Sequence, residues 1–232
     1  MIERRPAAGL GRFRNDWLDT RYHFSFADWV KPDRMGWGRL RVWNDDEIAA
    51  GAGFPLHGHA DMEIITYVRR GAISHRDSLG NRGRTAAGDV QVMSAGSGIR
   101  HAEFNAESEP TTLFQIWIEP DFQGGPPSWA ARAFPKADRS GAFITLASGA
   151  PGDDDALPIR ADARVLGAAL TAGQSINLPL PAGRHLYLAP AAGRIEINDL
   201  ELETGDGAAI RDETMLTIRA LTEAEVVAVD TR

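Results

Sequence analysis

Short apolar stretches separated by turn-forming residues run along the whole chain. They are rich in β-branched and aromatic residues and are bounded by Gly, Pro, Asn and Asp, a pattern typical of β-strands. The clearest predicted strands are Glu63–Val68, Val90–Met93, Thr112–Ile118, Phe143–Ala147, His185–Leu188, Arg194–Ile197 and Glu225–Val229. Helical periodicity is scarce, and short segments near Ser128–Ala133 and Asp45–Ala50 are its best candidates. The pattern predicts an all-β fold of barrels or sandwiches with few short helices.

An imperfect internal repeat indicates that there are two such barrels. In each copy a tyrosine is followed by two turns in the same order and then by the pair Gly-Asp. The repeated residues are Tyr67, Gly88 and Asp89 in the first copy and Tyr187, Gly205 and Asp206 in the second. The glycine- and proline-rich segment from Pro120 to Arg139 is the expected boundary region. We therefore predict one domain over residues 1–130 and a second over residues 131–232.

Composition narrows the chemistry. The 232 residues, 43% of them hydrophobic, are enough for a core in each domain. Cysteine is absent, which excludes disulfides and thiol nucleophiles and leaves nitrogen and oxygen as ligands for any metal. A net charge of −7 disfavours direct binding to nucleic acid. The arginine-containing N-terminus lacks the apolar core of a secretory signal, and no apolar run is long enough to span a bilayer, so we expect a soluble cytoplasmic protein.

Two pairs of potential metal ligands stand out within residues 51–105. His57 and His59 are separated by one residue, so on an extended strand both side chains point to the same face. His101 and Glu103 repeat this spacing on a second predicted strand. A single His-x-His is often an exposed coincidence, but two pairs on facing strands of a small barrel can reach one ion. Such a set suits iron, copper, nickel, manganese, cobalt or zinc better than calcium or magnesium, which prefer oxygen.

The same region resembles the cupin superfamily. The first cupin motif corresponds to Gly51, His57, His59, Glu63 and, one residue late, Gly71. The second motif corresponds to Gly88, Ser94 in the place of proline, Gly96, His101 and Asn105. Four residues instead of two precede its histidine. These departures, together with neighbouring residues, resemble the pirin family and its bacterial quercetin 2,3-dioxygenases. The neighbouring residues include Trp17, Leu18, Asp19, His23, Phe24, Ser25, Phe26, Arg41, Asn44, Asp45, Asp61, Met62, Tyr67, Asp77, Ser78, Gly80, Asn81, Met93, Gly98, Ile99 and Arg100.

The resemblance implies two jelly-roll-like cupin domains, of which residues 1–130 bind the metal and residues 131–232 form a degenerate cupin without a metal site. It implies His57, His59, His101 and Glu103 as the ligands of one divalent transition metal, with Fe(II) as the first expectation. It further implies ring cleavage of a flavonol by O2, with Glu103 as both ligand and catalytic base. Two covalently joined barrels replace the dimer common among single cupins, so we expect a monomer.

Other functions stay open at this point. Pirins also act as metal-dependent regulators that bind a transcription factor or a metabolic enzyme, and fold and site would be the same for both functions. A small aromatic compound other than quercetin is a further alternative for the substrate.

The sequence leaves two alternative roles for each of four further polar residues. Glu63 is expected near the ligands or in a structural role, and His23 either at the cavity mouth or in N-terminal packing. His75 and Asp77 are expected in a solvated turn, with a place behind the ligands as the alternative.

Overall fold

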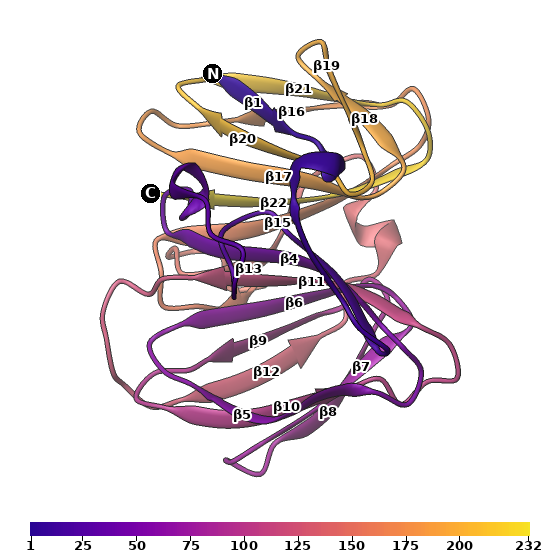
Figure 1. Ribbon diagram of the computed structural model, residues 1–232. Helices are drawn as coiled ribbons and strands as arrows, with labels where there is room; N and C mark the ends of the chain where they lie inside the picture. Colours follow the sequence, from indigo (N-terminus) through magenta and orange to yellow (C-terminus); the bar gives the residue numbers. More distant parts are fainter.

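The computed structural model describes residues 1–232 and consists of four β-sheets arranged as two jelly-roll-like barrels (Figure 1). The sheets of the first barrel contain β2 (Gly11–Arg14), β3 (Leu18–Tyr22), β4 (Leu40–Ile48), β5 (Gly53–His59), β6 (Glu63–Arg70), β7 (Ala72–Asp77), β8 (Arg82–Ala86), β9 (Val90–Ser94), β10 (Ile99–Phe104), β11 (Thr111–Ile118) and β12 (Ser128–Arg132). A seven-stranded sheet with the order β12-β9-β6-β11-β4-β3-β2 faces a four-stranded sheet with the order β5-β10-β7-β8. The all-β prediction is confirmed.

The second barrel repeats this arrangement. Its sheets contain β1 (Ile2–Arg5), β13 (Ile144–Ser148), β14 (Leu157–Pro158), β15 (Ala163–Leu170), β16 (Ser175–Pro179), β17 (His185–Ala192), β18 (Arg194–Ile197), β19 (Leu200–Glu203), β20 (Gly207–Arg211), β21 (Met215–Ala220) and β22 (Ala224–Thr231). The large sheet has the order β1-β20-β17-β22-β15-β13-β14 and the small sheet the order β16-β21-β18-β19. Every strand predicted from the sequence lies on, or largely within, an observed strand.

Helical structure is limited to three short 3-10 turns, η1 (Ala7–Gly9), η2 (Pro32–Arg34) and η3 (Lys136–Arg139). The two predicted helical segments are wrong. Ser128–Arg132 forms β12 and pairs with β9, while most of the segment from Asp45 to Ala50 belongs to the end of β4. Pairing with neighbouring strands satisfies these backbones and overrides the weak local preference. None of the helices has the length and apolar character needed to cross a bilayer.

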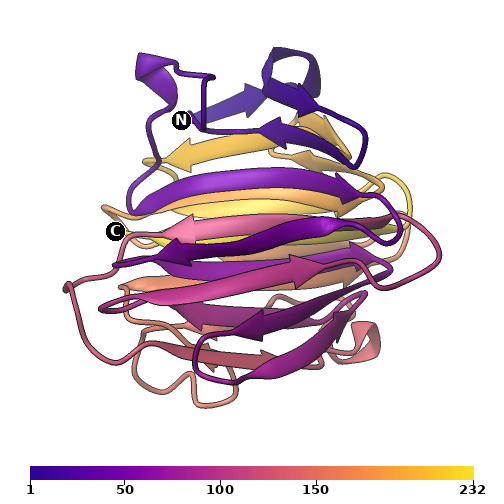
Figure 2. The same cartoon turned by 60° about the horizontal axis from the view of Figure 1, so that its bottom comes forward.

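The internal repeat is confirmed by the way each large sheet is completed at one edge. β12 pairs with β9 in the first barrel, and β1, from the start of the chain, pairs with β20 in the second (Figures 1 and 2). The repeated aspartates have matching roles: Asp89 accepts the backbone N–H of Phe134 after β12, and Asp206 accepts that of Ala7 after β1. The division at residues 130 and 131 stays a prediction, and β1 joins a sheet on the other side of it.

The apolar core lies in two places. A cluster of 24 buried residues fills the space between the two large sheets, with Trp43 and Phe114 from one side and Val165 and Tyr187 from the other. A second cluster of 18 residues fills the interior of the second barrel. Inside the first barrel only clusters of 5 and 4 residues occur. Apolar side chains therefore fill the interior of the first barrel much less than they fill the interior of the second.

His23 belongs to the contact between the barrels and not to a cavity mouth. Its ring is fully buried, packs against Trp43 and forms a 2.7 Å hydrogen bond through Nδ1 with the Tyr187 hydroxyl. Burial, reinforced by nearby arginines, lowers the pKa of His23 to about 3 from its ordinary value of 6.5. The folded protein thus holds this imidazole neutral at pH values where the unfolded chain protonates it.

This pKa difference predicts a loss of stability in mild acid. Between about pH 6.5 and 3 the unfolded state binds a proton that the folded state does not, so stability falls as the pH falls. Between about pH 7 and 5 the wild type should lose about 2 kcal/mol more unfolding free energy than His23→Gln, which cannot titrate. Urea unfolding of both metal-free proteins at the two pH values measures this difference. Equal losses of unfolding free energy in the two proteins would contradict the lowered pKa of His23.

Candidate metal centre

Pairing of β5 with β10 brings the two predicted ligand pairs together. The strands run antiparallel, with His101 opposite His57 and Ile99 opposite His59. A bulge between His101 and Glu103 shifts the register, so that Glu103 lies opposite Phe54. Gly53 of β5 permits the close approach of the two strands, because a Cβ atom at this position would lie 2.2 Å from the Glu103 carbonyl oxygen.

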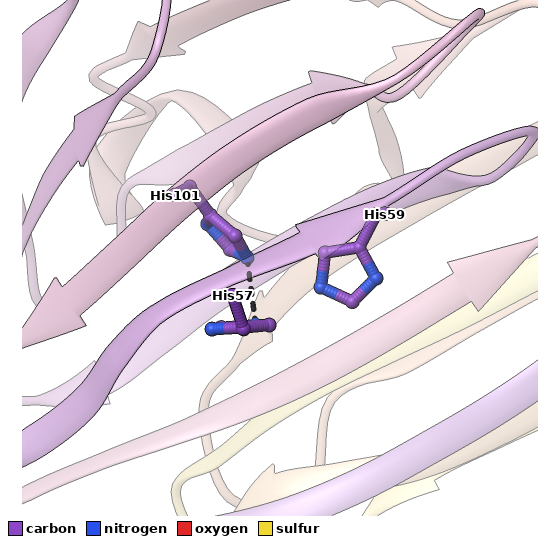
Figure 3. A group of neighbouring side chains, drawn as sticks. All are labelled: His57, His59 and His101. Atoms are coloured by element: carbon purple, nitrogen blue, oxygen red, sulfur yellow. Dashed lines mark hydrogen bonds between the residues drawn. The ribbon is translucent and has the colours of Figure 1, made fainter.

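The three imidazoles of His57, His59 and His101 converge on one point (Figure 3). One ligand nitrogen from each lies within 4.8 Å of the others, and Nε2 of His57 is 3.1 Å from Nε2 of His101. His57 donates its Nδ1 hydrogen to the Pro55 carbonyl at 2.8 Å. This hydrogen bond leaves the His57 Nε2 lone pair pointing into the cluster, which is the usual arrangement of a metal-binding histidine.

The electrostatics of the cluster suit cation binding. Burial lowers the pKa of His101 to about 3, with further lowering by the neighbouring histidines. Burial, followed by the proximity of His57, lowers the pKa of His59 to about 4. Both rings are therefore neutral at neutral pH and keep a lone pair for a metal. Neutral imidazole nitrogens at this spacing fit a transition metal, because one cation can accept all three lone pairs.

Glu103 lies on the inner face of β10 and is held by hydrogen bonds from the opposite sheet. Its Oε1 accepts Gln91 Nε2 at 2.6 Å and Thr66 Oγ1 at 3.3 Å, and its Oε2 accepts Gln115 Nε2 at 2.8 Å. The donors lie in one row across β9, β6 and β11, since Thr66 is opposite both Gln91 and Gln115. Burial raises the pKa of Glu103, while these hydrogen bonds favour the ionised carboxylate.

Two overlapping groups of possible metal ligands contain the four predicted ligands, and the second group also includes His75. His57, His59 and His101 form one, and His75, His101 and Glu103 form the other, each with ligand atoms within 4.8 Å. His101 belongs to both. The complete set of His57, His59, His101 and Glu103 stays a prediction, although all four line the same cavity.

His75 is the residue of this region that the sequence reasoning misplaced. It is buried, its Nε2 is 3.1 Å from Asp77 Oδ2, and its ring stacks on Trp129 with 4.7 Å between centroids. A solvated turn is therefore wrong for His75. On β7 it lies directly opposite Glu103, a cross-strand relation that no spacing in the sequence reveals.

Glu63 takes a structural position. Its carboxylate is buried and accepts a hydrogen bond from the Ser94 hydroxyl on the adjacent strand. Burial raises the pKa of Glu63. It does not line the cavity that contains the histidines. Of the two roles expected for Glu63, the structural one agrees with this position.

The histidine cluster opens into a cavity of about 330 Å³ between the two sheets of the first barrel. This volume is at the lower end of the range of small-molecule sites, about 300–1,000 Å³. Aromatic and aliphatic groups form most of the walls, and the polar groups gather at the histidines and at β3 and β4. The cavity is lined by Leu18, Thr20, Tyr22, Phe26, Asn44, Asp46, Phe54, Pro55, His57, His59, Ile64, His101, Glu103, Gln115 and Trp117.

Comparison with known proteins agrees with this architecture. Residues 4–118 match the family model described as Pirin, and residues 145–231 match that of the quercetinase C-terminal cupin domain. A pirin-like protein from Caulobacter vibrioides is 61% identical over 99% of both chains. A quercetin 2,3-dioxygenase from Escherichia coli is 39% identical over 99% of this chain and 98% of its own. The crystal structure of a bacterial pirin from Escherichia coli in complex with nickel(II) superimposes with a TM-score of 0.93 at 38% identity, covering 100% of this chain and 99% of that one.

Proposed function

Because this chain belongs to the pirin family, we propose that it is a metal-dependent dioxygenase that cleaves the heterocyclic ring of quercetin-like flavonols with O2. The observation that carries the proposal is the convergence of three histidines, two of them with strongly lowered pKa values, on the wall of a largely apolar cavity. The name of the E. coli relative, a quercetin 2,3-dioxygenase, supports the choice of substrate.

The donor set fits one divalent transition metal held by His57, His59, His101 and Glu103. The nickel(II) complex of the E. coli pirin supports a metal at this centre, while Fe(II) is what the family resemblance first implied for this chain. Bound there, such a metal would supply Lewis-acid stabilisation of a deprotonated flavonol and a site for its reaction with O2. The protein's own side chains bind and orient the substrate and take up its proton.

The cavity walls bind and orient a planar aromatic substrate. Phe54 and Trp117 flank the histidines, and the Trp117 ring lies 4.9 Å from that of His59 in an edge-on arrangement. Tyr22 and Phe26 add further aromatic surface, with 5.1 Å between their centroids. Burying a flavonol among these rings removes apolar surface from water and holds its oxygens toward the histidines.

Glu103 is the base in this proposal. Gln91 donates to Oε1 and Gln115 donates to Oε2, while the one hydroxyl hydrogen of Thr66 is shared between Oε1 and the Gln115 oxygen. The carboxylate therefore keeps one lone pair for the metal and one that can accept the proton of the flavonol hydroxyl. Burial raises the pKa of the carboxyl and makes it a stronger base than an exposed glutamate. The three donors also fix the direction in which the carboxylate points.

A second candidate role, binding of a protein partner, has one observation in its favour. On the outer face of the small sheet, Arg76 of β7 lies directly opposite Arg82 of β8, and neither forms an ion pair, whereas Arg84 nearby pairs with Glu107. Like charges in this relation are unfavourable unless an anion lies between them. An acidic segment of a partner would supply that anion. This role requires no turnover, so an assay of turnover distinguishes the two functions.

The oxygen dependence of quercetin loss tests the enzymatic function. Metal-loaded protein should consume quercetin under air and not under argon. His57→Ala should lose at least about 100-fold of the rate, because changing residues that only support the ligands already costs about 10–100-fold at such sites. Absorbance of the flavonol with parallel elemental analysis provides the measurement. The proposal fails if the protein, fully loaded with any of the candidate metals, leaves quercetin intact under air.

Glu103→Gln separates the base from the ligand role. The amide keeps the shape of the side chain and an oxygen for coordination but cannot take up the proton. We expect turnover to fall by about 10²–10⁴-fold, with metal content reduced much less. Steady-state rates normalised to bound metal measure the effect. If rate and metal content fell in equal proportion, Glu103 would act as a ligand alone.

A further inference from the structure

Besides Tyr22 and Gln115, three polar side chains of the large sheet line the cavity, whereas the histidines face it from the small sheet. They are Thr20 on β3 and Asn44 and Asp46 on β4. Thr20 lies directly opposite Asp46, and Asn44 precedes Asp46 by two residues on the same face. Only 2%, 5% and 2% of their surfaces, in the order Thr20, Asn44 and Asp46, are exposed. Buried polar groups in this position need hydrogen-bond partners.

The protein supplies these partners only in part. Thr20 Oγ1 lies beside the Asp46 carboxyl and favours its ionised form, whereas Asn44 Oδ1 is buried and has no hydrogen-bond partner. Gln115, which lies opposite Asn44 in the same row of the sheet, differs: it accepts from Thr66 and donates to Glu103. The chain of hydrogen bonds that holds the carboxylate therefore ends at Gln115, and the neighbouring Asn44 Oδ1 is left as an acceptor for a ligand.

A hydroxyl group on a ligand matches the hydrogen-bonding chemistry of Thr20, Asn44 and Asp46. Asn44 Oδ1 is an acceptor and needs a donor. Burial raises the pKa of Asp46 to about 7, so near neutral pH its carboxyl can donate as well as accept. A phenolic hydroxyl both donates and accepts, while a carboxylate on the ligand would face the lone pairs of Asn44 and would be repelled. The apolar walls nearby, such as Leu18 and Phe26, suit the ring that carries the hydroxyl.

We propose that Thr20, Asn44 and Asp46 form a hydroxyl-binding corner that selects flavonols with a hydroxyl on the pendant ring, which does not carry the oxygens that face the histidines. The inference rests on the proposed function and deepens it by naming the substrate class. A substrate without that hydroxyl leaves Asn44 desolvated and unpaired, and Asp46 with Thr20 as its only partner, when it enters. Discrimination of this kind comes from the cost of unpaired buried groups more than from the strength of one hydrogen bond.

Binding of two flavonols under argon tests the corner without any turnover. Quercetin carries hydroxyls on its pendant ring, whereas galangin has the same chelating oxygens and an unsubstituted pendant ring. We expect the metal-loaded wild type to bind quercetin about 10-fold more tightly than galangin. In Asn44→Leu and in Asp46→Leu, which keep similar side-chain volumes, the ratio should fall to within about 2-fold. Absorbance titration gives both dissociation constants.

Ile64→Val is the matched control, because it alters the same cavity without removing a polar atom. It should change the binding of both flavonols alike and leave their ratio unchanged, with metal content equal in all proteins. A wild type that binds the two flavonols equally, or leucine variants that keep the wild-type ratio, would overturn the corner. If the protein turns over quercetin in air but binds the two flavonols equally, the dioxygenase function stands and the hydroxyl-binding corner is rejected. If the protein binds quercetin more tightly than galangin but turns over neither, the corner stands and the dioxygenase function is rejected.

Discussion

The double pairing of β10 is the interaction on which the site depends. β10 hydrogen-bonds to β5 on one side and to β7 on the other, so His101 faces His57 and Glu103 faces His75. Antiparallel partners have side chains within about 5 Å of each other, which is the spacing that one ion or one hydrogen-bond network needs. A slip of β10 by one residue would turn Ala102 inward and both polar side chains outward. The pairing of β10 on both sides therefore decides which side chains face the cavity.

The two barrels share a topology, but the second has an apolar interior that stabilises the fold, while the first contains the polar residues of the candidate site. The inner face of the second barrel is filled with aliphatic residues, for example Leu188 and Ile218. The corresponding space in the first barrel is crossed by a row of polar side chains, from Asn44 through Gln115 and Thr66 to Gln91. The last three of these hold the buried Glu103 carboxylate. Such a row contributes less to stability than an apolar core. The large cluster between the barrels lets the first domain keep its cavity open.

Strand alternation is a local property, so the sequence predicts the all-β fold and the common face of His57 and His59, which the structure brings together. Relations between strands are not local, and beyond the meeting of the two ligand pairs they could not be predicted. His75 lies opposite Glu103, although nothing along the chain links them. Asp46 fell in a segment predicted as helix, so its place in the cavity could not be inferred. Cross-strand register, and with it the environment of each buried polar group, follows only from the packed barrel.

Anomalous diffraction from crystals soaked in one divalent transition metal tests the central claim most directly. We expect a single strong peak in contact with Nε2 of His57 and of His101, a ring nitrogen of His59 and the carboxylate of Glu103. A peak bound instead by His75, His101 and Glu103, without His57 and His59, would contradict the assignment of the metal centre. The absence of any peak at the histidine cluster after soaking would contradict it as well.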